Sequence, residues 1–139
     1  SINNTTVTMA NSSATESSET ITVDLNTLGY ADKAAATTAT LGDGTTIVFD
    51  KNSGTTAPTF YTATKGVRVY KNNTITINGK KAIAKILFTC DSDAKGNYVG
   101  NTTATILFSG NTATYTNAST ETGGGVQLKV QTITITYAK

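Results

Sequence analysis

The segment CDSDAKGN, residues 90–97, contains the side chains of this chain that come nearest to a metal site. Asp91 and Asp93 have the spacing of the first two ligands in the calcium loop D-x-[DN]-x-[DN]-G, and Gly96 falls at its glycine position. Lys95 occupies the third ligand position, where its positive charge repels a cation. We therefore expect a solvated loop between two strands, with Asp91 and Asp93 as weak calcium candidates and no cofactor.

Proton-transfer catalysis at neutral pH finds little support in the composition. The chain has no histidine, so its single cysteine, Cys90, has no imidazole to activate it. Cys90 shares the apolar phase of Ile86 and Phe88, which predicts a small buried side chain. Two carboxylates could act as acid and base in glycoside hydrolysis, but most acidic residues fall in polar segments. We predict that the protein is not an enzyme.

Aromatic side chains are the groups with which this chain could hold a sugar, and they must be tyrosine or phenylalanine because tryptophan is absent. Tyr115 and Tyr137 fit apolar strand phases, so we expect them in the core. The remaining aromatic residues near Pro58, near the single arginine and at a loop tip give the candidate glycan contacts Phe60, Tyr61, Arg68, Tyr70 and Tyr98. Pairing of tyrosines across strands is the structural alternative.

The low charge of the chain indicates what surrounds it. Charged residues make up 14% of the 139 residues, against about 25% in typical domains. Threonine, serine, asparagine and glycine must form the surface, as in secreted proteins, fibrous adhesins and virion components. The net charge is +2 with no basic stripe, so we expect no nucleic-acid partner. No apolar run reaches the about 20 residues of a membrane span.

Short strands must position all of these residues. Apolar residues alternate with period two in segment after segment from Thr20 onward, which is typical of strands that bury one side. Glycine-containing turns separate them at residues 43–44, 78–79 and 109–111, and Asn78-Gly79 is the strongest hairpin signal. Only residues 30–40 could form a helical turn or two. The pattern predicts an all-β fold, an antiparallel, jelly-roll-like β-sandwich over residues 20–139.

Two of the expected strands change phase. Ile83 is out of register with Ile86, and Val130 is out of register with Ile133. One extra residue in each strand, a β-bulge, would restore burial on a single face. Passage of the strand from one sheet to the other is the alternative.

The first 19 residues are rich in serine, threonine and asparagine, which predicts a polar N-terminal arm. Its apolar residues are Ile2, Val7 and Met9, and the last two share a strand phase. They could add a strand to a neighbouring subunit or pack on the chain's own domain. We expect Ile2, Val7 and Met9 to make assembly contacts. Ser1 is compatible with a removed leader or a trimmed initiator methionine, and the sequence leaves both open.

Four segments carry a resemblance to a known kind of domain: TITVDLNTLGYADKAA, GTTIVFDKNSGTTAPTFY, GVRVYKNNTITINGKKAIAKILFT and VQLKVQTITITYAK. Residues 20–139 resemble a β-sandwich accessory or surface domain of secreted proteins of gut Bacteroidetes and of their phages. The resemblance implies a β-sandwich and a non-catalytic role, and it names no ligand. The polar arm departs from that pattern and puts the role of an appendage to an enzyme in doubt.

These observations lead to two expectations for function. The first is a non-catalytic structural or decorating subunit of an extracellular assembly, foremost the capsid surface of a bacteriophage virion, with other protein subunits or copies of itself as partners. The alternative is a carbohydrate-binding or adhesive module of a secreted gut-bacterial protein, with surface glycans as partners. Both place the chain in an extracellular location or on a virion surface.

Overall fold

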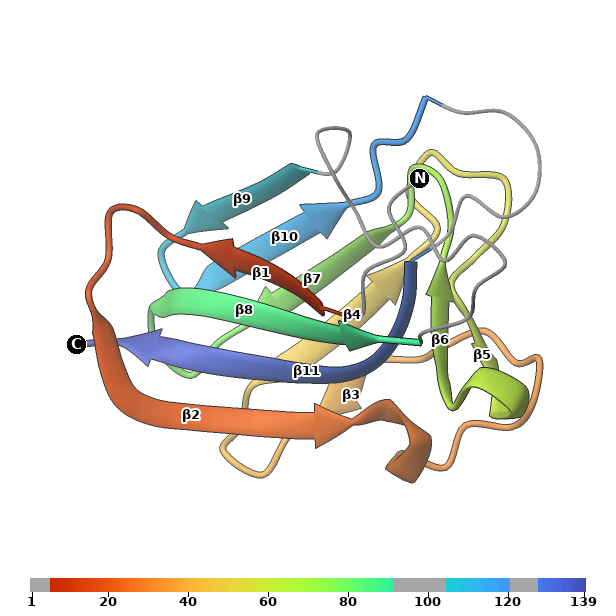
Figure 1. Cartoon of the computed structure of the whole chain (residues 1–139), viewed down its shortest axis with the longest axis horizontal. Helices are drawn as coiled ribbons and strands as arrows, with labels where there is room; N and C mark the ends of the chain where they lie inside the picture. The colour runs from red at the N-terminus through yellow and green to blue at the C-terminus, as the bar shows by residue number, and fades with distance from the viewer. Residues whose placement is uncertain (1–5, 92–104, 121–127) are drawn as a thin grey trace.

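The computed structural model describes residues 6–91, 105–120 and 128–139 of the chain. The predicted all-β class is confirmed, because two antiparallel sheets pack against each other as a β-sandwich (Figure 1). Helical structure in these ranges consists of two short 3-10 turns, η1 (Leu25–Thr27) and η2 (Thr62–Thr64). Residues 30–40 form no helix, and the Asp32 carboxylate in this segment accepts a hydrogen bond from the backbone nitrogen of Thr62.

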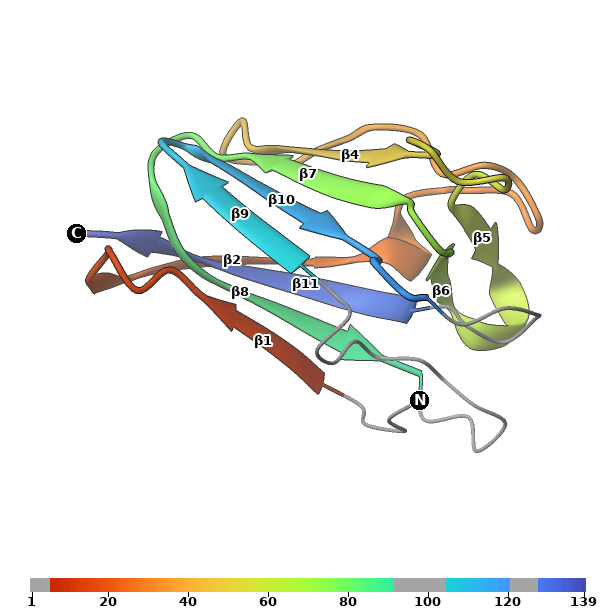
Figure 2. The same ribbon diagram turned by 90° about the horizontal axis from the view of Figure 1, so that it is seen from above.

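The first sheet has the strand order β1-β8-β11-β6-β5, and β2 also pairs with β11. Its strands are β1 (Thr6–Ala10), β2 (Glu16–Asp24), β5 (Thr59–Tyr61), β6 (Gly66–Val69), β8 (Ile83–Cys90) and β11 (Leu128–Ala138). The second sheet has the order β3-β4-β7-β10-β9. Its strands are β3 (Ala39–Thr40), β4 (Thr46–Asp50), β7 (Thr74–Asn78), β9 (Thr105–Ser109) and β10 (Thr112–Thr116). Figure 2 shows that β1 and β9 lie at the same side of the two layers.

The core lies between the two sheets. Because side chains alternate with period two, one side of each strand faces this core. Ile77 of β7 and Ile133 of β11 are at most 1% exposed. The rings of Phe88 in β8 and Tyr115 in β10 meet edge to face across the layers, with centroids 5.4 Å apart. Burying each large apolar side chain contributes roughly 1.5–3 kcal/mol. The interlayer contacts therefore hold the sandwich together.

The predicted bulge in β11 is present. Val130 pairs with Cys90 and Thr132 pairs with Thr89, which leaves Gln131 as the extra residue. Strand β11 stays in the first sheet along its whole length. The bulge therefore explains the change of phase, and a switch between sheets does not occur.

The second predicted bulge lies in β8. Tyr137 pairs with Ile83 and Thr136 pairs with Lys85, so Ala84 is the extra residue on β8. Ile83 is thereby returned to the core, where it is 1% exposed.

Two of the three predicted hairpin turns are confirmed. Gly44 and Gly110 have φ values of 91° and 57° and join β3 to β4 and β9 to β10. The hairpin prediction at Asn78-Gly79 is wrong, because β7 and β8 belong to different sheets. Gly79 instead permits a close approach, since a Cβ atom there would lie 2.6 Å from the carbonyl oxygen of Lys81.

The described part of the N-terminal arm joins the first sheet through β1 and the beginning of β2, with a turn at residues 11–15 between them. β1 pairs with β8 in antiparallel register, and Met9 is buried while Val7 is half-buried against the core. The predicted boundary after residue 19 needs correction, because it falls inside β2, which runs along β11. The alternation of Val7 and Met9 is satisfied on the chain's own sheet edge. Ile2 lies outside the described residues.

The packing of Gly66 against the β11 bulge predicts a strong effect of Gly66→Ala. A Cβ atom at residue 66 would lie 2.2 Å from the carbonyl oxygen of Val130, which is backbone and cannot swing aside. We expect the free energy of unfolding to fall by about 1–3 kcal/mol or more. Urea denaturation of the purified variant measures this loss.

Gly42→Ala is the matched control, because no heavy atom lies within 4 Å of a Cβ atom built at Gly42. Its free energy of unfolding should stay within about 0.5 kcal/mol of the wild type. Equal stabilities for the Gly66 and Gly42 variants would show that the bulge is not packed against β6.

Candidate functional site

Three of the five predicted glycan contacts come together on the outer face of the first sheet. Tyr61 ends β5, Arg68 lies in β6, and Tyr70 follows β6. Arg68 points outward because its neighbours on either side in β6, Val67 and Val69, are fully buried in the core. Its guanidinium carbon lies 3.8 Å from the centroid of the Tyr61 ring, within cation-π distance. We call Tyr61, Arg68 and Tyr70 the Tyr-Arg cluster.

Tyr70 contacts both other members of this cluster. Burial raises the pKa of Tyr70 to about 12, hydrogen bonding with Tyr61 acts in the same direction, and the charge of Arg68 opposes it. The phenol of Tyr70 therefore stays protonated at neutral pH. It can donate a hydrogen bond, and it cannot act as a base.

The other two predicted glycan contacts do not join this cluster. Phe60 alternates with Tyr61 in β5, so its ring faces the core, where it is 1% exposed and lies 5.8 Å from the Tyr30 ring. The assignment of Phe60 to a glycan surface is corrected for that reason. Tyr98 lies outside the described residues.

Of the two weak calcium candidates, Asp91 belongs to the described residues. Asp91 is half-buried directly after β8, and its backbone nitrogen donates a hydrogen bond to the carbonyl oxygen of Lys129. Asp93 lies outside the described residues. Within the ranges that the structure describes, no group of three or more His, Cys, Asp or Glu side chains could hold a metal ion.

Cys90 is buried, as its strand phase predicted. The side chain is 3% exposed, and burial raises the pKa of its thiol to about 12, with the nearby charge of Asp91 acting in the same direction. The reactive thiolate form is therefore scarce at neutral pH.

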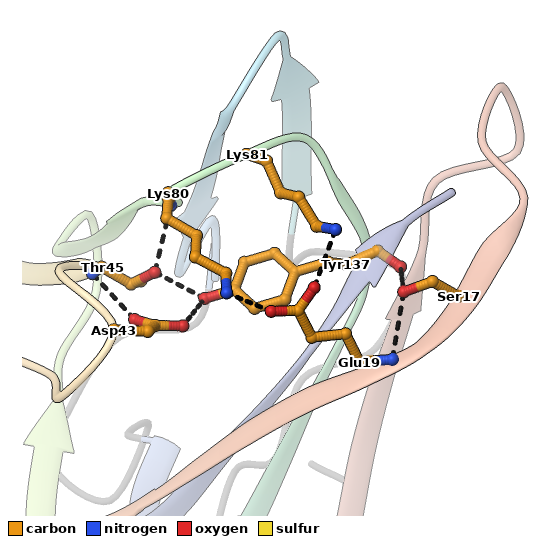
Figure 3. A network of polar contacts seen from close by, with 7 residues as sticks. All are labelled: Ser17, Glu19, Asp43, Thr45, Lys80, Lys81 and Tyr137. Carbon is orange, nitrogen blue, oxygen red and sulfur yellow. Dashed lines mark hydrogen bonds and ion pairs between the residues drawn. The ribbon is translucent and has the colours of Figure 1, made fainter.

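A second polar group of side chains joins the two sheets at one end of the sandwich (Figure 3). It connects β2 and β11 of the first sheet with the β3–β4 turn and the β7–β8 crossover. We call it the interlock network, and its members are Ser17, Glu19, Asp43, Thr45, Lys80, Lys81 and Tyr137.

The hydroxyl of Tyr137 lies at the centre of the interlock network. It donates a hydrogen bond to the carboxylate of Asp43 and also contacts the Thr45 hydroxyl. Burial raises the pKa of Tyr137 to about 12, and the hydrogen bond to Asp43 adds to this. Burial alone would raise the pKa of Asp43, but hydrogen bonds from Tyr137 and Thr45 lower it below its ordinary value. At neutral pH Tyr137 is thus a neutral donor and Asp43 an ionised acceptor.

Glu19 supplies the ionic part of the network. Its carboxylate forms ion pairs with Lys80 and with Lys81, the latter at 2.7 Å. The hydrogen bond from Lys80 lowers the pKa of Glu19, and Glu19 in turn raises the pKa of Lys80. Lys80 also lies 5.3 Å from the centroid of the Tyr137 ring. One lysine therefore links the carboxylate of β2 to the aromatic ring of β11.

The pKa shifts of the described residues favour structure and binding over proton transfer. A general acid or base works best with a pKa near the operating pH. Each shifted pKa here moves further from neutrality. It is lowered at Glu19, Asp32 and Asp43 and raised at Tyr30, Tyr70, Lys80, Cys90 and Tyr137.

Two buried asparagines position the Tyr-Arg cluster, and sequence reasoning did not single them out for this role. Asn73 is fully buried, and its side chain accepts a hydrogen bond from the backbone nitrogen of Tyr70 while donating to the carbonyl oxygen of Lys51. Asn117, also fully buried, donates to the carbonyl oxygen of Val69. Both amides satisfy backbone groups where strand pairing ends. The bond between Asn73 and Tyr70 spans three residues, but the contacts with Lys51 and Val69 join segments 22 and 48 residues apart, which the sequence does not reveal.

No protein-family model, no curated protein and no solved structure matches the chain. The resemblance to surface domains of gut Bacteroidetes and their phages therefore stays a prediction. In the described part of the chain, no helix is long and apolar enough to cross a membrane. The functional argument depends on the residues themselves.

The lowered pKa of Glu19 makes a prediction about acid stability. A carboxylate with a lowered folded-state pKa stabilises the fold above its unfolded value, here 4.5, and this contribution is lost as the pH falls through the folded value. Glu19→Gln should therefore unfold at a lower temperature than the wild type at pH 7. The difference between the two melting temperatures should shrink progressively below pH 4.5. Thermal unfolding followed by circular dichroism from pH 7 to pH 2 measures it.

Salt provides the control for this experiment, because about 1 M salt screens ion pairs between partly exposed groups. The difference in melting temperature at pH 7 should shrink in high salt as well. A difference that is the same at pH 7 and at pH 2 would contradict an ionic role for Glu19.

Proposed function

We propose that this protein is a non-catalytic structural or decorating subunit of an extracellular assembly, such as the capsid surface of a bacteriophage virion. It contacts neighbouring subunits through the outer edges of β1 and β9, each of which pairs with one strand among the described residues. The observation that carries the proposal is that these two edges lack the usual protection against strand addition.

The β1 and β9 edges lie at the same side of the sandwich (Figure 2). Their sequences, TVTMA and TILFS, contain neither a charged residue nor a proline, which are common means of protecting a sheet edge. Leu107 in β9 is 68% exposed. Among the described residues it is the one large hydrophobic side chain that is exposed. Free backbone groups beside an exposed leucine fit the addition of a strand from a partner.

The other sheet edges are protected in familiar ways. β2 carries the acidic residues Glu16, Glu19 and Asp24. β3 and β5 contain only two and three residues, too few to guide an added strand. The contrast among the edges favours docking at the side formed by β1 and β9.

The rest of the described surface is consistent with a role in contact rather than catalysis. Threonines lie on the outer face of the first sheet in β2 and β11, where the hydroxyls of Thr22 and Thr134 are 2.9 Å apart. Asp24 and Asp50 accept hydrogen bonds from nearby backbone nitrogens, and Glu16 pairs with Lys85 at 2.9 Å. These carboxylates therefore form bonds with other parts of the fold.

Leu107→Lys tests the docking edge directly. The substituted side chain is exposed, so the fold should persist, while a lysine on the edge opposes strand addition. We expect association between subunits to weaken at least tenfold and incorporation into particles to fall accordingly. Sedimentation velocity of the purified chain and its quantification in isolated particles measure the two effects.

Val48→Lys is the matched control, because Val48 is a half-buried residue of the inner strand β4 in the same sheet. It should associate as the wild type does once its folding has been verified. Unchanged association of the Leu107 variant would reject β9 as the docking edge. A wild-type chain that is monomeric at all concentrations and is found in no particle would reject the proposed function.

A further inference from the structure

The Tyr-Arg cluster lies far from the proposed docking edges in the order of strands. β5 and β6 form one end of the first sheet, and β1 forms the other. A ligand held at this cluster would leave the β1 and β9 edges free. The two surfaces can therefore be tested separately.

Arg68 is the single arginine of the chain, and the sheet places a second cation beside it. In the register of β5, β6 and β11, Arg68 lies between Thr59 on one side and Lys129 on the other. Side chains directly opposite each other in paired strands share a face and interact. Lys129 is 5% exposed, so Arg68 is the cation of this pair that is more open to solvent.

The guanidinium of Arg68 has hydrogen-bonding capacity that the described residues do not fill. Its Nε atom is buried and has no hydrogen-bond partner. The ion pairs within the described ranges are made by Lys80, Lys81 and Lys85, and none of them involves Arg68. A buried donor without a partner costs free energy, and a bound ligand is one physical reason for keeping it.

The neighbours of Arg68 hold its guanidinium in one orientation. The Tyr61 ring stacks on its face at 3.8 Å, which leaves the edge that carries the N–H groups for an acceptor. The Tyr70 hydroxyl hydrogen-bonds with both Tyr61 and Arg68, so it helps to fix the guanidinium in place. Both tyrosines are half-exposed, so the cluster faces solvent next to the buried Nε atom.

We infer that the Tyr-Arg cluster binds the carboxylate of an acidic sugar. A planar arginine fork accepts a carboxylate through two parallel hydrogen bonds, which a lysine cannot reproduce. The two tyrosine rings offer apolar surface for a sugar ring. The Thr59 hydroxyl donates its proton to the carbonyl oxygen of Ala57, and its oxygen can accept a hydrogen bond from a sugar hydroxyl. An acidic peptide would bind the arginine fork through a carboxylate and would make no contact with the tyrosine rings or the hydroxyl.

The test is titration calorimetry of the full chain with trigalacturonate and with the neutral trisaccharide of galactose. The wild type should bind the acidic sugar and not the neutral one. Arg68→Lys keeps the charge and loses the fork, so its affinity should fall at least tenfold. Tyr70→Phe, which loses only a hydroxyl, should bind several-fold more weakly than the wild type.

Two further variants distinguish binding at this cluster from general charge attraction and from binding at the docking edge. Lys139→Gln removes one exposed positive charge beyond the other end of β11 and should bind as the wild type does, which excludes general attraction to a cationic surface. The Leu107→Lys variant should also bind trigalacturonate as the wild type does. Sugar binding and subunit docking can therefore be lost independently of each other. Circular dichroism verifies that each variant is folded.

Three results would overturn the inference. These are no binding of trigalacturonate by the wild type, equal binding by the Arg68→Lys variant, and equal affinity for the neutral trisaccharide. Binding of a glutamate-rich peptide as tightly as the sugar, lost in the Arg68 variant, would overturn the assignment to a sugar.

Discussion

Strand β11 is the element on which the rest of the structure depends. It pairs with β8 along one side and with β6 and then β2 along the other, so it joins the strands of the first sheet. The bulge at Gln131 keeps the apolar residues of this long strand on one face. Figure 1 shows that β11 is bent. One end of β11 supports β6 and therefore Arg68, and the other end carries Tyr137 into the interlock network. Stability and the candidate binding surface thus depend on the same strand.

Several charged side chains form contacts within the fold, and these contacts limit the chemistry that the side chains can perform. Glu19 and Asp43 are committed to the interlock network, where lysines and hydroxyls keep them ionised at neutral pH. Tyr137 is kept neutral in the same place. Groups held so far from their titration range are poor proton shuttles and good structural partners. We propose that this sandwich acts through two surfaces, an uncharged pair of strand edges and one arginine with aromatic neighbours.

Sequence reasoning succeeded where the signal is local. Period-two alternation predicted the strands, and the slips at Ile83 and Val130 predicted both bulges, because a bulge changes the phase of its own strand. It failed where pairing is nonlocal: the Asn78-Gly79 turn joins strands of different sheets, and turn chemistry does not report sheet membership. Period-two alternation predicts the correct strand phase for Val7. The sequence does not show whether that strand pairs with the sheet of its own chain or with the sheet of a neighbouring subunit. Phe60 is buried because it alternates with Tyr61, so strand phase could have excluded it from the surface.

The central claim is that the molecule acts by contact at the side formed by β1 and β9. Hydrogen–deuterium exchange of the free chain compared with the chain in its native particle tests this claim most directly. Backbone amides that point outward from an edge strand exchange readily when unpaired and are protected when a partner strand is added. We predict that protection rises at residues 6–10 and 105–109. Protection confined to β2, or no change at any edge, would contradict the claim.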